Sequence, residues 1–220
     1  MKEIKSLIWK DIKLELRQQN TINTIVLFMV STIFLCYTSF MLRTNSLEAL
    51  TWNTLFWIIL LFSAVNSAGN SFRKETAGRH LYYYQLAGPG AIILAKIIFN
   101  FLLLLVLSVL GFGLSLALLG NHLADYKIYF IALVLGSLGF SASLTLLAGI
   151  ASKTDNSSGV LAVLNLAVLL PLINMLLKVS KNAMDGLAVS AGYDEILTIF
   201  GIDLIVIALS YLLFPYLWKS

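Results

Sequence analysis

Few side chains in this 220-residue sequence are of types that could carry out chemistry. His80 and His122 fall in different connecting segments and are expected to be ordinary interfacial residues, and the single cysteine, Cys36, lies inside an apolar run. Residues 139–143 lack the last glycine of a nucleophile elbow, and residues 152–154 lack the glycines of a phosphate-binding loop. We therefore predict no catalytic residue, no metal site and no directly bound cofactor, and expect that the chain is not an enzyme.

One acidic side chain, Asp203, falls inside an apolar run. Ionisable groups within a membrane are costly and are candidates for function by default. Lys178 directly follows the preceding apolar run, and we expect it to lie at the same depth as Asp203, on the outer side of the membrane. Two interpretations stay open: Asp203 forms a structural ion pair with Lys178, or it has a role in transport.

The composition places these residues in a membrane protein. Hydrophobic residues make up 59% of the chain and charged residues 12%, about half the charged share of soluble domains. Six apolar stretches reach the ~20 residues that a membrane-spanning helix needs: 21–42, 50–70, 91–119, 128–151, 159–177 and 196–218. None of these stretches alternates polar and apolar residues, as a strand of a membrane β-barrel does. We predict an all-α membrane protein with six transmembrane helices and no room for a soluble catalytic domain.

The distribution of basic residues predicts the orientation. Eleven lysines and arginines fall on the side of both termini and four on the other side. Cytoplasmic loops carry the excess of basic residues, so both termini are expected in the cytoplasm. Lys96 lies near the cytoplasmic start of the third span, where a lysine can extend its charge to the interface.

Residues 1–20 form the first of two predicted domains, and 21–220 form the six-span domain. Apolar residues recur at helical spacing on one side, with basic residues opposite: Ile4, Leu7, Ile8, Ile12 and Leu16 against Lys10, Lys13 and Arg17. This pattern is typical of an interfacial amphipathic helix whose basic side chains face anionic lipid headgroups.

Small residues are frequent in the third and fourth spans. They are Gly111, Gly113, Ser115, Ala117, Gly136, Ser137, Gly139, Ser141 and Ser143. Small residues allow helices to approach closely in lipid. Two interpretations stay open: these residues pack within one bundle, or they line a dimer interface or a substrate path.

The connection between the second and third spans, residues 70–90, is the most unusual segment. It carries charged residues, then three tyrosines, then a Gly-Pro-Gly break at Pro89, where a helix boundary is expected. The pattern favours a short amphipathic cytoplasmic helix. Exposed arginine and aromatic residues are typical of protein contacts, but tyrosines also anchor helix ends at the membrane interface, and both interpretations stay open.

The same segment resembles a known family. The signature runs Glu75-x-x-Gly78-x-x-Leu81, Leu86-x-x-Pro89 and Ala95-Lys96, and it is similar to the cytoplasmic loop of ABC-2-type transporter permeases. Residues 141–151, 159–164 and 171–172 are similar to the fourth and fifth spans of a narrower group, the CcmB (cytochrome c maturation protein B) haem-exporter family. The resemblance covers essentially the whole chain.

The resemblance implies the membrane permease subunit of an ABC transporter complex acting in haem delivery or export for c-type cytochrome biogenesis, in the bacterial inner membrane. A separate cytoplasmic ABC ATPase would hydrolyse ATP, and haem would be the transported species. Further partners implied are a second copy of the chain, a haem-handling CcmC-type protein and a small CcmD-type protein, with no nucleic acid. The expected ATPase-coupling residues are Phe72, Arg73, Lys74, Glu75, Gly78, Leu81, Tyr82, Tyr83 and Tyr84, with Pro89 and Lys96 marking the start of the third span.

Two alternatives share most of these features. One is an ABC-2-type permease for another substrate, such as a lipid-linked glycan or a drug. The other is a membrane scaffold that is not coupled to transport, from which no ATPase subunit would co-purify.

Overall fold

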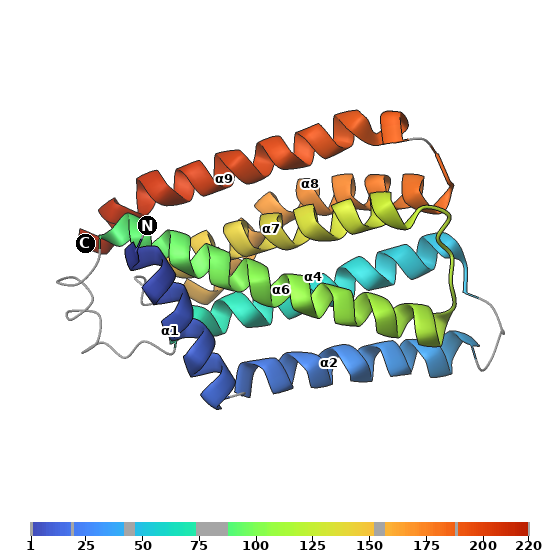
Figure 1. Cartoon of the computed structure of the whole chain (residues 1–220), viewed down its shortest axis with the longest axis horizontal. Helices are drawn as coiled ribbons and strands as arrows, with labels where there is room; N and C mark the ends of the chain where they lie inside the picture. The colour runs from blue at the N-terminus through green and yellow to red at the C-terminus, as the bar shows by residue number, and fades with distance from the viewer. Residues whose placement is uncertain are drawn as a thin grey trace.

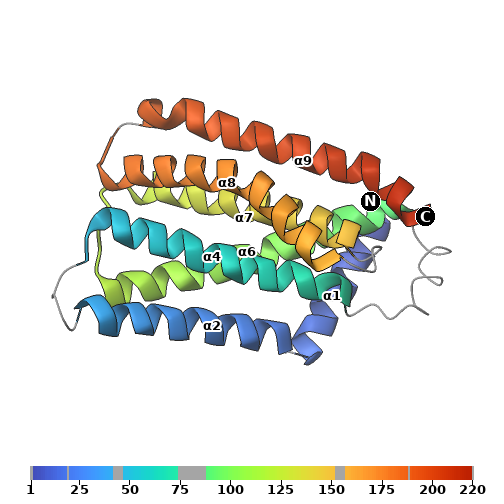
Figure 2. The same cartoon turned by 180° about the vertical axis from the view of Figure 1, so that it is seen from behind.

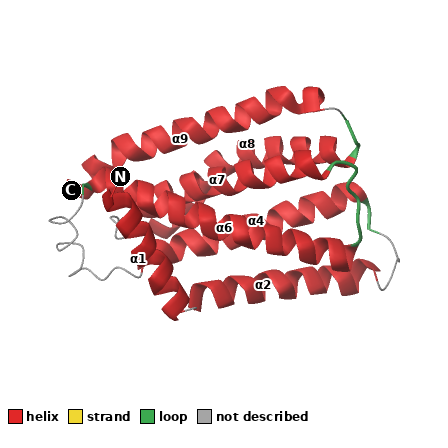
Figure 3. Cartoon of the chain, viewed as in Figure 1, coloured by secondary structure: helices red, strands yellow, loops and turns green. Residues whose placement is uncertain are grey.

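A computed structural model describes residues 2–18, 20–41, 47–73, 88–151, 157–187 and 189–219. Within these ranges the chain is helical and has no strand (Figure 3). The elements are α1 (Lys2–Gln18), α2 (Asn20–Cys36) continued by the π-helical turn η1 (Tyr37–Met41), α4 (Ala49–Arg73), α6 (Pro89–Leu119), α7 (Tyr126–Ala151), α8 (Ser157–Met184), the 3-10 turn η2 (Val189–Gly192) and α9 (Tyr193–Lys219). Six of the helices are long and apolar enough to cross a membrane, which confirms the predicted fold class.

Local sequence explains where two of the long helices begin. Gly88 precedes α6 in an extended conformation, and Pro89 occupies the first turn, where its missing N–H costs no hydrogen bond. Before α7, one carboxylate oxygen of Asp125 accepts hydrogen bonds from the backbone N–H of Lys127 (2.8 Å) and Ile128 (3.3 Å). This is an N-cap arrangement that satisfies otherwise unpaired amides.

Helix α8 continues beyond the end of the predicted fifth span. The apolar run ends at residue 177, but α8 continues to Met184. Beyond Lys178 the helix is amphipathic: Val179 and Ala183 are buried against the core, and the hydroxyl of Ser180 accepts a hydrogen bond from the Trp57 indole. Packing on one side therefore extends the helix past the point where hydropathy falls.

The helices form a bundle with α7 at its centre (Figure 1). Helix α7 packs against α4, α6, α8 and α9, and 67% of its spanning residues are buried, against 17% for α2 and 22% for α9. Viewed from behind, α8 lies beside α7 and α4 (Figure 2). Helices α2 and α9 thus form opposite edges of the bundle.

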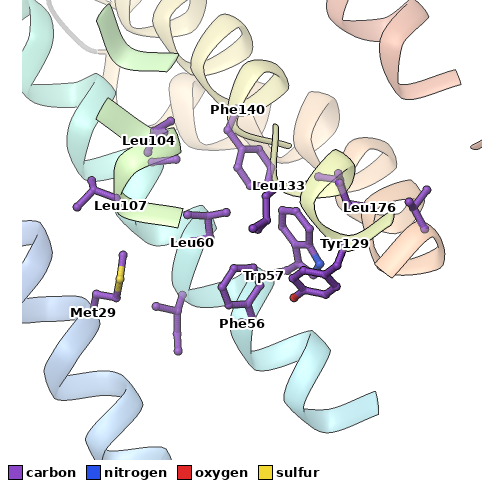
Figure 4. Close-up of a cluster of buried hydrophobic side chains, with 14 of the residues drawn as sticks. Met29, Phe56, Trp57, Leu60, Leu104, Leu107, Tyr129, Leu133, Phe140 and Leu176 are labelled. Carbon is purple, nitrogen blue, oxygen red and sulfur yellow. The ribbon is translucent and has the colours of Figure 1, made fainter. Parts of the chain in front are cut away.

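The core between α4 and α7 is aromatic (Figure 4). The ring centroids of Phe56 and Trp57 are 5.5 Å apart, and Phe56 lies 5.8 Å from Tyr129. Gly136 makes room for this cluster, because a Cβ there would lie 2.6 Å from the Trp57 ring. Close packing of this kind holds helices together in lipid, where apolar burial alone gives little advantage.

The small residues of the third and fourth spans mostly pack within this one bundle. A Cβ at Gly111 would lie 2.6 Å from the sulfur of Met29 in α2, and Ser137, Ser141 and Ser143 are buried. Gly113 differs, since nothing lies within 4 Å of the position that its Cβ would occupy.

Helix α1 crosses α6 at the end of the bundle that holds both termini (Figure 1). Leu7 packs against Ile93 and its buried neighbours. Glu15, a residue without a predicted role, is buried, and its carboxylate accepts a hydrogen bond from the backbone N–H of Ile22 in the first turns of α2 (3.2 Å). Leu16, predicted to lie on the apolar side, is exposed, because Glu15 is the residue that faces the bundle at this turn.

Candidate functional site

The ends of α4 and α6 that flank the predicted coupling segment lie at one end of the bundle. Helix α4 ends there at Arg73, α6 begins at Pro89, and α7 ends and α8 begins at the same end, beside the two termini (Figure 1). An even number of spans places both termini on the same side of the membrane. The connections after the second and fourth spans lie on that side too.

Most of the predicted coupling residues lie outside the described residues. These are Lys74, Glu75, Gly78, Leu81, Tyr82, Tyr83 and Tyr84. Phe72 and Arg73 belong to the last turn of α4, and Pro89 begins α6 as predicted. The roles of these residues therefore stay predictions.

The start of α6 is enclosed by its neighbours. A Cβ at Gly90 would lie 2.5 Å from the Tyr211 ring of α9, and Ile93 is buried among residues of α7 and α9. Lys96 is also buried, at 3% exposure, so the prediction that it extends to the interface is wrong. The reason is that α1, α7 and α9 surround this part of α6.

Polar side chains connect the central helices. From α6 to α7, the Asn100 amide donates to the Thr145 hydroxyl (2.8 Å), and the Ser137 hydroxyl donates to that of Ser108 (3.3 Å). From α4 to α8, the indole N–H of Trp57 donates to Ser180 (2.8 Å). Interhelical hydrogen bonds add to packing in lipid, so α4 and α6 are each tied to a neighbouring helix.

Asp203 lies in the interior, where α9 meets α7 and α8. It is the eleventh residue of α9, ~15 Å from the start of the helix, since α9 begins three residues before the predicted span. Its side chain is buried beside Gly139 and Leu172. Neither carboxylate oxygen has a hydrogen-bond partner among the described residues.

The predicted pairing of Asp203 with Lys178 is not formed. Lys178 is exposed and lies six residues beyond Leu172 on α8, ~9 Å along the axis and on another side of the helix. Because Leu172 is the residue of α8 that contacts the Asp203 region, Lys178 lies on a different side of α8, away from Asp203.

A second polar cluster lies at the end of the bundle opposite the termini, and it was not predicted from the sequence. The Trp52 ring lies 5.9 Å from Tyr129 and 6.2 Å from His122. The indole N–H of Trp52, the hydroxyl of Tyr129 and Nε2 of His122 are all buried without a hydrogen-bond partner among the described residues. Aromatic residues at the starts of spans are typical of membrane interfaces, but only the packing shows that these three side chains meet.

The fold defines a class: an all-α multi-pass membrane protein whose interior is made of packed helices. A family model described as CcmB protein matches residues 2–215, nearly the whole length, and the chain belongs to the CcmB family. This family provides the membrane permease subunit of the haem-export system in c-type cytochrome maturation. No curated protein and no solved structure matches the chain.

Proposed function

We propose that this permease subunit couples ATP hydrolysis by a separate cytoplasmic ABC ATPase to haem transfer, or to release of the haem-loaded periplasmic chaperone. The observation that carries the proposal is that α4 and α7 end, and α6 and α8 begin, at the end of the bundle where both termini lie. The excess of lysine and arginine at this end supports its placement in the cytoplasm, and the proposed location of the chain is the bacterial inner membrane.

In this proposal, residues 72–84 bind the ATPase. Arg73, Lys74 and Glu75 make polar contacts, and Tyr82, Tyr83 and Tyr84 anchor the segment by packing. Because α4 is tied to α8 through Trp57 and Ser180, and α6 to α7 through Asn100 and Thr145, a displacement at this segment would reach four helices. Nucleotide binding at the ATPase would then bias the bundle between two states.

The proposed complex is symmetric. Two ATPase subunits need two membrane halves, so a second copy of this chain is expected. The CcmC-type and CcmD-type proteins would complete the complex on the membrane side.

The test is a charge reversal in the proposed coupling segment. Glu75→Lys should leave the chain in the membrane but reduce recovery of the ATPase with it in mild detergent, and should lower haem staining of c-type cytochromes. Asp185→Lys is the matched control, because Asp185 is exposed in the turn after α8, at the opposite end of the bundle. Normal haem staining and full ATPase recovery in Glu75→Lys would contradict the proposed coupling role.

A further inference from the structure

Helix α1 carries two adjoining grooves that share one side chain. The first, of 480 Å³, lies between α1 and α6 and is lined by Ile4, Lys5, Ile8, Trp9 and Ile98. The second, of 570 Å³, lies on α1 and is lined by Ser6, Trp9, Lys10, Lys13, Leu14 and Arg17. Trp9 lines both grooves and is 58% exposed.

The two grooves differ in chemistry. The groove beside α6 is apolar except for Lys5 at its edge. The other groove is basic: Lys13 and Arg17 are exposed one turn apart, and the Lys13 ammonium lies 5.4 Å from the centre of the Trp9 ring. Lys10 is paired with Asp11 at 3.1 Å, so Lys13 and Arg17 carry most of the positive charge of this surface.

The apolar groove opens onto a membrane-facing side of α6. Ile98, which lines the groove, is followed at four-residue intervals by Leu102, Val106 and Leu110, and all four are exposed. Residues four apart lie on the same side of a helix. A hydrocarbon chain that enters the groove can therefore continue along α6 within its membrane-spanning segment.

We propose that the two grooves form a binding site for one anionic phospholipid. The phosphate lies at Lys13 and Arg17, and an acyl chain passes Trp9 into the α1–α6 groove and continues along Ile98 and Leu102. An acidic protein segment would match the basic groove but not the hydrocarbon-facing continuation along α6, which favours a lipid. The bound lipid fastens α1 to α6, the helix of the third span.

The test measures quenching of Trp9 fluorescence in the full chain, reconstituted in phosphatidylcholine nanodiscs. Phosphatidylglycerol or phosphatidylcholine brominated on the acyl chain is added, since bromine quenches a tryptophan that it contacts. Subtracting the signal of Trp9→Phe isolates the contribution of Trp9, because the other three tryptophans, Trp52, Trp57 and Trp218, are common to both proteins. Trp9 should be quenched at a lower fraction of phosphatidylglycerol than of phosphatidylcholine.

Charge variants separate a defined site from general attraction. Lys13→Gln with Arg17→Gln should reduce the preference for phosphatidylglycerol by about fivefold for each charge removed. Lys178→Gln with Lys181→Gln is the matched control, because it removes two exposed basic charges at the other end of the bundle, and the preference should not change. Equal quenching by the two lipids, or equal loss of preference in the two double variants, would overturn the proposal.

Two further measurements test the lipid itself. Excess inorganic phosphate should leave the preference in place, whereas its loss would show that the basic groove binds free phosphate and not a lipid. Ile98→Gln should weaken quenching by both brominated lipids alike, and unchanged quenching would exclude the acyl-chain path along α6.

Discussion

Asp203 of α9 lies directly against Gly139 of α7: a Cβ on Gly139 would come 2.5 Å from the Oδ1 atom of Asp203 and 2.8 Å from a methyl group of Leu172. This contact is where the buried acid of α9 meets both α7 and α8. A glycine at this position is what allows the three helices to approach with Asp203 between them.

Gly139→Ala should destabilise the bundle by about 1–3 kcal/mol, the usual cost of overpacking a filled interior. Gly113→Ala is the control, because nothing lies within 4 Å of its Cβ position, and in an exposed helix alanine is favoured over glycine by about 1 kcal/mol. Thermal unfolding of both variants in mild detergent compares them. Equal melting temperatures would show that the contact at Gly139 does not limit helix packing.

A double-mutant cycle tests the separation of Asp203 from Lys178. Asp203→Asn and Lys178→Met should have effects on the free energy of unfolding that add to within about 0.5 kcal/mol, because Lys178 is exposed and the Asp203 oxygens have no hydrogen-bond partner among the described residues. The unfolding of the two single variants and the double variant supplies the coupling energy. A coupling well above that range would mean that the two charges pair in the folded protein.

The hydrogen bond between Asn100 and Thr145 should contribute about 0.6 kcal/mol, and at most about 1.7 kcal/mol, as interhelical bonds in membranes do. A cycle of Asn100→Leu and Thr145→Val measures it by unfolding in detergent. Thr54→Val serves for comparison, since its hydroxyl donates to the Leu50 carbonyl in its own helix and its loss should give no coupling with Asn100→Leu. Coupling of similar size in both cycles would argue against a specific α6–α7 bond.

Glu15→Ala should cost about 0.5–2 kcal/mol, the range for losing a side-chain acceptor at a helix N-terminus. The variant leaves the Ile22 N–H without the carboxylate that accepts its hydrogen bond at 3.2 Å. Glu15→Gln keeps an acceptor oxygen and should retain most of the stability. Thermal unfolding distinguishes them, and a Gln variant as unstable as the Ala variant would show that charge, not the hydrogen bond, matters at the α1–α2 junction.

The sequence by itself determined that the described residues include six helices long and apolar enough to cross a membrane, that α6 begins at Pro89 and that residues 2–18 form a helix. Spans can be read from hydropathy because a backbone in hydrocarbon must satisfy its own hydrogen bonds, which leaves a helix of sufficient length as the solution. Pro89 was predictable because proline restricts the residue before it.

Only the tertiary structure decided which side of each span faces the interior. Helix α6 is apolar on its membrane-facing side at Leu102 and on its buried side at Leu104. Because both sides are apolar, the hydropathy of the sequence does not predict which side of α6 faces the interior. The burial of Lys96, the enclosure of Asp203 by Gly139 and Leu172, and the meeting of Trp52 with Tyr129 all depend on that rotation and on which helices are neighbours. Close packing and interhelical hydrogen bonds set both, and neither is encoded in any one span taken alone.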